Sequence, residues 1–202
     1  MTGKFIVFEG IDGSGKTTCL ETVADYLHSC HIPYIKTGEP NETYGMRAII
    51  KHELVRQEIN DPLAELFMFS LDRQLHLISE IKPALMKGLN VLCDRYIDST
   101  RVYQGYLQGL SLKYVKVVQS AFISPDLTLL FDLPAELGMK RIGDRATKKE
   151  KFENIRLLER AREAYLKIAS ASPKKYRILD ATKPKARLAR QAIKAIEEVL
   201  NL

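Results

Sequence analysis

A glycine-rich segment near the start of the chain limits the folds that this sequence can adopt. Residues 10–17 read Gly-Ile-Asp-Gly-Ser-Gly-Lys-Thr, which matches the pattern G-x-x-x-x-G-K-[ST] in full. A short apolar run from Phe5 to Glu9 precedes the segment, and a helical pattern from Lys16 to about Cys30 follows it. The motif requires this order of strand, loop and helix. The sequence therefore predicts a phosphate-binding loop at the end of a buried strand.

The residues of this loop suit a nucleoside triphosphate. Its glycines let backbone N–H groups turn toward phosphate oxygens, and the positive end of the following helix adds to the attraction. Lys16 is a point charge for the β- and γ-phosphates, and the Thr17 hydroxyl suits Mg²⁺. We assign to the triphosphate Gly10, Ile11, Asp12, Gly13, Ser14, Gly15, Lys16, Thr17 and Thr18. GTPases, ATPases and kinases share such a loop, so it does not establish a kinase.

Apolar runs and helical patterns alternate along the rest of the chain. We expect further strands at residues 34–37, 91–93, 127–133 and 177–179. We expect helices at residues 44–55 and 63–87, and Pro83 can kink or break the second of them. This alternation is typical of βαβ units on a parallel sheet. Residues 1–202 should therefore form one three-layer α/β domain whose ligands bind at the carboxyl ends of the strands.

Charge and cysteine content narrow the class of protein. The formal net charge of +6 indicates a polyanionic partner, either a nucleic acid or the phosphates of a nucleotide. The sequence has no long Lys/Arg block and no basic stripe interleaved with aromatic residues, so we expect no nucleic-acid partner. Cys19, Cys30 and Cys93 are too scattered for a disulfide framework, and we expect buried free thiols. The apolar run at Phe5 is too short for a signal peptide or a membrane span, which predicts a cytoplasmic protein without membrane contact.

Further motifs follow the loop in a fixed order. Asp94-Arg95-Tyr96 is followed by Ser99-Thr100-Arg101-Val102-Tyr103-Gln104-Gly105, while Phe69–Arg73 fits F-x-x-D-R and Pro125–Leu129 reads P-D-L-T-L. Together with the opening Phe8–Thr18, these segments resemble the thymidylate kinase family of nucleoside-monophosphate kinases over nearly the whole chain. The resemblance implies a P-loop NTPase fold with a five-stranded parallel sheet flanked by helices. It also implies ATP and Mg²⁺ as donor and cofactor, dTMP as acceptor and a homodimer.

Two pairs of residues suit the base of such an acceptor. Phe69 and Arg73 are one helical turn apart and share a face, as do Thr100 and Gln104. A flat ring beside a planar cation can stack on and hydrogen-bond an uncharged pyrimidine, and a Gln amide can donate and accept at the Watson–Crick edge of thymine. The resemblance assigns Phe69 to stacking, Arg73 to a base carbonyl and Tyr103 to the sugar.

Each of these assignments has a plainer alternative. Phe69 can be a core residue, and Arg73 a surface residue that pairs with Asp72 or Glu65. Tyr103 can be a half-buried core tyrosine that touches no ligand. Residue types and spacing alone do not separate these alternatives from a base pocket.

Charged residues at the strand ends complete the expected site. Asp94 ends a strand beside the loop, where a carboxylate can hold Mg²⁺ through water or orient the acceptor phosphate. Arg95 can bind that phosphate with two hydrogen bonds, and the alternative is a structural ion pair between Asp94 and Arg95. The resemblance pairs Asp12 with the 3′-hydroxyl of the acceptor or with metal-bound water. Glu9, at the end of the strand before the loop, can also be a supporting partner of these groups.

A basic segment at about residues 138–152 matches the position of the family's lid. Arg141 and Arg145 fall where lid arginines fall, and we expect Arg141 to fix the phosphates or the adenine side of ATP. Arg145 is expected to supply charge in the transition state. The expected catalytic residues are therefore Lys16, Asp94, Arg95 and Arg145. The plainer interpretation of the segment is a solvated, charged end of a helix.

The chain departs from the family pattern at two arginine positions. The family's T-R-E-P is here Thr37-Gly38-Glu39-Pro40, and its G-x-x-I-R is Gly45-Met46-Arg47-Ala48-Ile49. Lys36, Arg47 or Lys51 can substitute for the missing charge. Two other functions therefore stay open: a related kinase that prefers dUMP or another deoxynucleotide, and a non-catalytic regulatory module that binds ATP.

Overall fold

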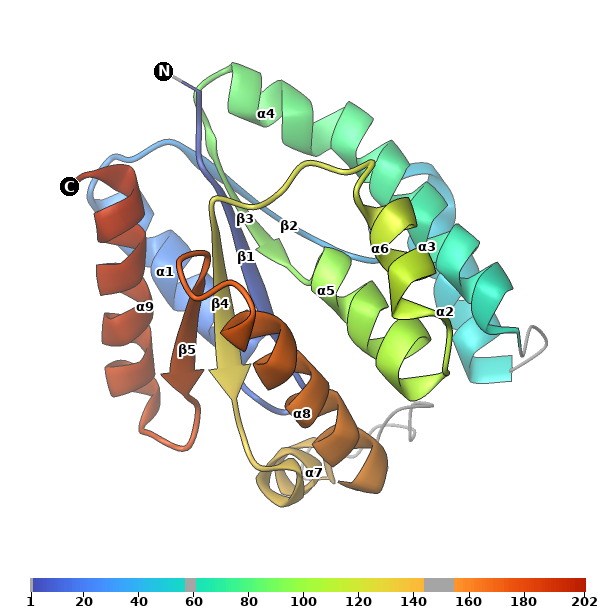
Figure 1. The fold of residues 1–202 in the computed structure, drawn as a ribbon. Coiled ribbons are helices and arrows are strands. Elements are labelled where there is room, and N and C mark those ends of the chain that lie inside the picture. Colours follow the sequence, from blue (N-terminus) through green and yellow to red (C-terminus); the bar gives the residue numbers. More distant parts are fainter. Residues whose placement is uncertain (1, 57–60, 144–154) are drawn as a thin grey trace.

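The computed structural model describes residues 2–56, 61–143 and 155–202 of the chain (Figure 1). Five parallel strands form one sheet in the order β2-β3-β1-β4-β5. The strands are β1 Phe5–Gly10, β2 Tyr34–Gly38, β3 Asn90–Asp94, β4 Leu127–Asp132 and β5 Tyr176–Asp180. The expected five-stranded parallel sheet is confirmed, and each predicted strand agrees to within one residue at either end.

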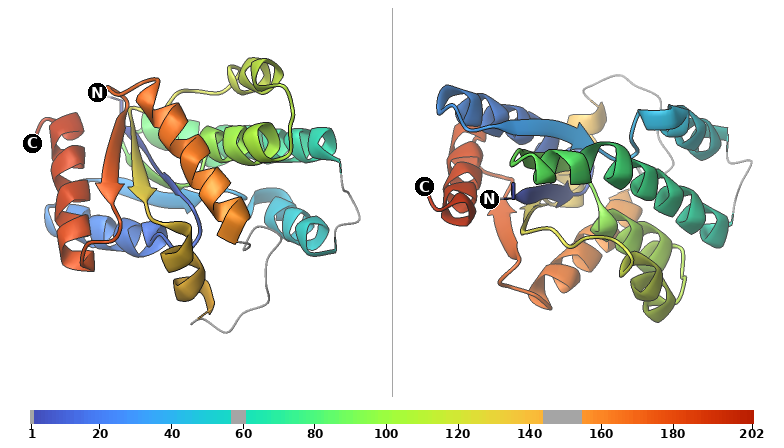
Figure 2. Two further views of the ribbon diagram at one scale, coloured as in Figure 1. Left: turned by 60° about the horizontal axis from the view of Figure 1, so that its bottom comes forward. Right: turned by 90° about the horizontal axis from the view of Figure 1, so that it is seen from above.

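Helices cover both faces of the sheet, as Figures 1 and 2 show. Helices α1 and α9 lie on one face, and α4, α5 and α8 lie on the other. The helices are α1 Lys16–Ser29, α2 Met46–Arg56, α3 Pro62–His76, α4 Lys82–Met86, α5 Ile97–Thr100, α6 Leu112–Gln119, α7 Ala135–Gly143, α8 Ile155–Ser170 and α9 Lys185–Leu200. This three-layer arrangement is the one that the alternation of patterns predicts.

The central strand β1 is buried along its whole length, as a parallel strand covered on both faces should be. Because successive side chains point to opposite faces, Phe5 and Val7 join a core cluster under α4, while Ile6 and Phe8 pack in the cluster around α1 and α9. The loop that follows β1 is thus anchored by the most buried strand of the sheet.

Two π-helical segments interrupt the helices that lie between β2 and β4 in the sequence. The expected helix at 63–87 continues past Pro83, but it widens into a π-helix at Leu77–Ile81 (η2) before α4 begins. Pro83 then lies in the first turn of α4, where a residue without an N–H is tolerated. A second π-helix, Arg101–Leu107 (η3), continues α5, and it carries Tyr103 and Gln104. Such widened turns occur frequently at functional sites.

The three cysteines are free, and two of them are buried. The expectation of burial is wrong for Cys30, which caps the carboxyl end of α1 and is exposed. None of the described helices is both long enough and apolar enough to span a membrane.

Candidate active site

The glycine-rich loop connects β1 to α1 at the carboxyl end of the sheet. Gly10, Gly13 and Gly15 have φ angles of 143°, 77° and 87°, which residues with side chains rarely adopt. Lys16 begins α1, and its Nζ lies 3.4 Å from the Ile11 carbonyl oxygen, to which it donates. Burial, together with the nearby Arg95 guanidinium, lowers the pKa of Lys16. The lysine is therefore held inside the loop, where an anionic partner would favour its charged form.

A cavity of about 380 Å³ opens in front of the loop. The loop contributes Gly13, Ser14, Gly15 and Thr18, and Arg141, Lys183 and Lys185 line the other side. The Ser14 hydroxyl is buried and has no hydrogen-bond partner among the described residues, as expected of a group that binds phosphate. Five of the residues expected to bind the triphosphate do not line this cavity: Gly10, Ile11, Asp12, Lys16 and Thr17.

Arg141 joins the loop to the turn after β5. Its guanidinium donates to the Gly13 carbonyl at 3.2 Å and to the Ala181 carbonyl at 3.1 Å. Helix α7, which carries Arg141, also packs directly on the loop, since a Cβ added to Gly13 would lie 2.4 Å from the Gly138 oxygen. Arg141 thus lines the cavity in front of the loop, and its expected contact with ATP stays a prediction. Arg145 and residues 144–152 of the expected lid lie outside the described residues.

Thr17 and Asp94 form a corner suited to a divalent cation. The Thr17 hydroxyl donates to Asp94 Oδ2 at 2.7 Å, which brings together the two residues expected to bind metal. Asp94 Oδ1 is buried and has no hydrogen-bond partner within the described ranges. In those ranges no group of three His, Cys, Asp or Glu side chains is arranged to hold a metal ion. Mg²⁺ fits this corner, because it commonly takes one or two protein ligands and completes its shell with water and phosphate.

A second cavity, of about 150 Å³, lies between the loop, α3 and η3. Its lining includes all seven residues expected to bind the acceptor: Asp12, Phe69, Arg73, Arg95, Thr100, Tyr103 and Gln104. They come from three segments that are far apart in the sequence. Glu39, Pro40 and Ser99 also line the cavity and were not predicted to do so. The position of Glu39 and Pro40 at the carboxyl end of β2 was the available indication.

Arg73 is buried among protein acceptors. Its five N–H groups donate to Glu39 Oε2 (2.9 and 2.6 Å), Thr100 Oγ1 (3.1 Å), Gln119 Oε1 (2.5 Å) and the Tyr96 carbonyl (3.0 Å). The alternative of a surface Arg73 paired with Asp72 or Glu65 is therefore wrong, and so is that of a core Phe69, which is half-buried at the cavity. A base carbonyl would have to share or replace one of these acceptors.

Arg95 points toward Asp12, across the mouth of the same cavity. Its guanidinium forms an ion pair with the Asp12 carboxylate, so the alternative pair between Asp94 and Arg95 is wrong. Lys16 Nζ lies 3.6 Å from the same carboxylate. Burial favours the neutral form of Asp12, but the guanidinium and the ammonium outweigh it and lower the pKa of Asp12 to about 2. Asp12 thus stays ionised and holds both cations at the loop side of the second cavity.

Comparison with known proteins decides the family. The sequence model of the family described as Thymidylate kinase matches residues 8–193. The thymidylate kinase of Desulfosudis oleivorans is 40% identical over 211 residues that cover 98% of each chain. The chain belongs to the thymidylate kinase family. The thymidylate kinase of Pelotomaculum thermopropionicum is 35% identical and the probable thymidylate kinase of Methanosarcina mazei is 37% identical, each over 100% of this chain and at least 96% of its own length.

Glu9 anchors the turn that carries Arg95 in this thymidylate kinase family member. Its Oε1 accepts from the backbone N–H groups of Tyr96 (2.8 Å) and Ser99 (3.1 Å), and its Oε2 accepts from the hydroxyls of Ser99 (2.8 Å) and Tyr165 (2.9 Å). Burial and the Asp98 carboxylate raise the pKa of Glu9 to about 7. Arg95 itself has a φ of 68°, an unusual conformation that this anchor holds in place.

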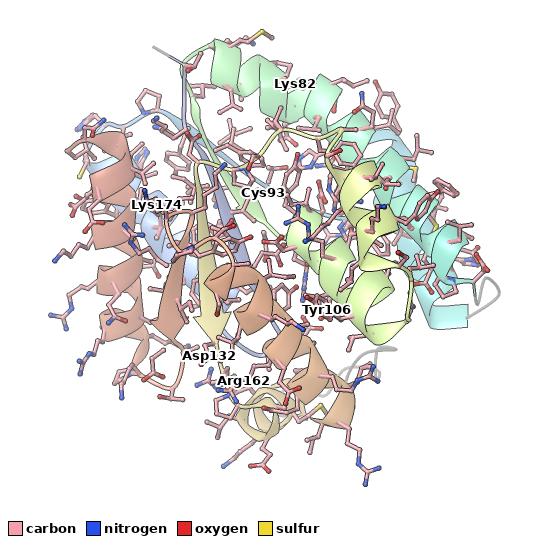
Figure 3. The ribbon with its side chains drawn as sticks, in the orientation of Figure 1. Lys82, Cys93, Tyr106, Asp132, Arg162 and Lys174 are labelled. Carbon is pink, nitrogen blue, oxygen red and sulfur yellow. The ribbon has the colours of Figure 1, made fainter. Side chains whose placement is uncertain are left out.

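Helix α8, which follows the lid segment, is fixed to the end of β4. Arg162 donates to both carboxylate oxygens of Asp132, at 2.6 and 3.2 Å, and the two residues lie together below β4 in Figure 3. Such a two-fold contact is a strong and directional ion pair. It gives Asp132, at a strand end where ligands are expected, a structural partner.

The two departures from the family pattern border a third cavity of about 600 Å³. Lys36, Gly38 and Arg47 line it together with Asp94 and Arg95. The Lys36 ammonium pairs with Glu21 and the Arg47 guanidinium with Glu42, and all four side chains are more than 40% exposed. Lys51 is exposed and does not line the cavity. Lys36 and Arg47 are thus the two suggested substitutes that reach the neighbourhood of Arg95.

Proposed function

We propose that this chain transfers the γ-phosphate of ATP to dTMP, giving ADP and dTDP, with Mg²⁺ as cofactor. The observation that carries the proposal is that one loop borders two cavities. Gly13, Ser14 and Gly15 line the triphosphate cavity, while Asp12, which pairs with Arg95 and lies 3.6 Å from Lys16 Nζ, lines the acceptor cavity. A module that merely binds ATP has no need of the second cavity.

The chemistry follows from positioning and charge neutralisation. The loop and Lys16 hold the β- and γ-phosphates, and Arg95 leaves Asp12 to bind the phosphate of dTMP. Thr17 and Asp94 hold Mg²⁺, which neutralises charge on the β- and γ-phosphates when it is bound. Phe69 stacks on thymine, Thr100 and Gln104 bind its edge, and Tyr103 lies against the sugar. The other groups keep their positions, and Arg95 is the one that exchanges Asp12 for the substrate phosphate.

ADP release from ATP, measured with and without dTMP, tests the proposal directly. We expect release that depends on dTMP and on Mg²⁺. The same assay with dUMP and dCMP tests the kinase that prefers another deoxynucleotide, which would turn these over faster. A protein that binds ATP but releases no ADP with any acceptor would be the regulatory module instead.

We also propose that the chain forms a homodimer through the outer face of α3. Leu63, Phe67, Leu71 and Ile78 follow one another at helical spacing along α3 and η2, and they are 38–53% exposed. Val117 on the neighbouring α6 is 63% exposed. Exposed apolar residues that form a continuous stripe mark interaction surfaces. The second copy is the occupant that the family resemblance implies.

Light scattering on the purified protein tests this interface. The wild-type chain should have the mass of a dimer, and Phe67→Glu combined with Leu71→Glu should give a monomer. Ile178→Glu, on the edge strand β5, is the matched control, because Ile178 is 50% exposed and lies away from α3. A wild-type monomer at all concentrations would refute the dimer and leave the proposed activity intact. The cytoplasmic location and the absence of a nucleic-acid partner stay predictions.

A further inference from the structure

A buried carboxylate controls one of the residues proposed to bind the base. Glu65 lies on α3, one turn before Phe69, and only 1% of it is exposed. Gln104 Nε2 donates to Glu65 Oε2 at 3.1 Å, and Gln108 Nε2 donates to the same oxygen at 2.7 Å. Gln104 is also 1% exposed, and it lines the acceptor cavity. The pair thus connects the interior of the helical layer to the wall of the cavity.

This contact fixes which end of the Gln104 amide is available to a ligand. Glu65 Oε2 accepts from the NH₂ groups of both Gln104 and Gln108, so the NH₂ end of the Gln104 amide faces Glu65. The carbonyl oxygen is therefore held on the opposite side of the amide. No described residue donates to Gln104 Oε1, which leaves this acceptor for a ligand in the cavity. Without Glu65, the amide could rotate by half a turn and exchange its donor and acceptor ends.

Thr100 offers a hydrogen-bond donor beside the Gln104 acceptor. Its hydroxyl oxygen accepts from Arg73, whose five N–H groups all have protein acceptors. The Thr100 proton is therefore free to be donated. The wall of the cavity offers one acceptor, from Gln104, next to one donor, from Thr100.

The hydrogen-bonding edge of thymine can pair with Gln104 and Thr100 in a single arrangement. Its Watson–Crick edge carries a single N–H, at N3, between two carbonyl oxygens. The Gln104 carbonyl can therefore accept from N3–H alone, and Thr100 then donates to a neighbouring carbonyl. Cytosine in the same position would place the lone pair of N3 against the Gln104 carbonyl, an unpaired and repulsive contact.

We propose that Glu65 is a positioning residue for acceptor specificity: it orients the Gln104 amide so that the site selects a base with an N3–H. The inference rests on the proposed function, because it takes the cavity to be the acceptor site. Uracil has the same N3–H as thymine, so Glu65 separates dTMP from dCMP and does not separate dTMP from dUMP.

The test compares kcat/KM for dTMP, dUMP and dCMP in Glu65→Gln. Glutamine has nearly the same shape, but it can donate as well as accept, so Gln104 is free to turn over. We expect the ratio of dTMP to dCMP to fall about tenfold, the effect of about one buried hydrogen bond. The ratio of dTMP to dUMP and the KM for ATP should stay within about twofold.

Gln108→Ala is the matched control. Gln108 donates to the same oxygen of Glu65 but does not line the cavity, so its loss should leave the ratio of dTMP to dCMP unchanged. If Glu65→Gln does not fold, Gln104→Met removes the acceptor that Glu65 is proposed to orient and leaves Glu65 its hydrogen bond from Gln108, and the same fall in the ratio is expected. An unchanged ratio in the folded variant, or an equal loss with all three acceptors, overturns the role of Glu65. A wild-type protein inactive with dTMP would instead refute the proposed function.

Discussion

The two halves of the candidate active site are built in different ways. In the triphosphate half, the loop and the start of α1 supply one wall of the cavity as a continuous stretch, from Gly13 to Thr22, and Lys16 lies within that stretch. The acceptor half consists of side chains from four segments, and its cations are already paired within the protein. Arg73 pairs with Glu39, and Arg95 pairs with Asp12.

This difference has a consequence for mutation. Lys16 of the loop can be lost without leaving its partner Asp12 unpaired, because Asp12 keeps Arg95, so function should fail while the fold survives. A residue of the acceptor half supports its neighbours, so its loss should affect both substrate binding and stability. The predictions below test this contrast, beginning with the largest expected effect.

Lys16→Ala should remove nearly all turnover and leave the protein folded. Lys16 holds phosphates, and its burial opposes its charge, so its loss removes no favourable structural interaction of comparable size. Steady-state ADP release and a thermal melt measure the two effects. Lys175→Ala, an exposed lysine distant from the loop, is the control. A Lys16 variant with half the wild-type kcat would contradict the assignment of the loop.

Arg145→Ala should lower kcat by at least about a hundredfold, with little change in KM for dTMP, as expected of an interaction made mainly in the transition state. The loop has no cation besides Lys16, so the lid is the expected source of the remaining charge. Arg141→Ala is the comparison, because Arg141 contacts the loop at Gly13 and should mainly change KM for ATP. If kcat survives in the first variant and collapses in the second, the two roles are exchanged. If both survive, the lid supplies no charge.

Arg73→Ala should raise KM for dTMP by one to two decades, about 1.5–3 kcal/mol, with little effect on KM for ATP. It should also lower the free energy of unfolding by about 3–5 kcal/mol, because buried Glu39 would lose its guanidinium partner and keep only the His76 ring, 3.4 Å away. Urea unfolding and substrate titrations measure the two effects. Adding Glu39→Gln to the variant should recover part of the stability and none of the affinity. Equal losses for both substrates would place Arg73 outside the acceptor site.

Sequence patterns predicted the residues of the acceptor cavity better than the partners that hold those residues in place. The loop, the strand ends and the residues of F-x-x-D-R and Y-Q-G were predictable, since each depends on neighbours in the chain. The partners Glu39 and Tyr165 were not, because they meet Arg73 and Glu9 across 34 and 156 residues. Helical spacing indicates which residues share a face, but it does not indicate which distant side chain they meet. The π-helix at Leu77–Ile81 was also missed, because one added residue in a turn leaves the apolar pattern nearly unchanged.

The smallest expected effect concerns Glu9, which supports the acceptor half from beneath. Its pKa is raised from 4.5 to about 7 by burial, so the folded protein binds this proton more tightly than the unfolded chain. The contribution of Glu9 to the free energy of unfolding should therefore decrease as pH rises from 4.5 to 7, and stay constant above that range. Glu9→Gln, which resembles the protonated form, should remove this dependence.

Urea unfolding of wild type and Glu9→Gln between pH 5 and pH 8 isolates the contribution of Glu9 to the free energy of unfolding. Asp72, whose pKa is raised to about 6 by burial, titrates in the same range, but it is present in both proteins and cancels in the difference. The variant should gain about 2–3 kcal/mol relative to wild type from pH 5 to pH 8, because one unit of pKa is worth about 1.4 kcal/mol. Parallel curves would mean that Glu9 is ionised throughout, held by its four hydrogen bonds. Titration of Glu9 would then not affect the stability of the turn that carries Arg95 in this pH range. The two halves of the site would differ only in how their cations are paired.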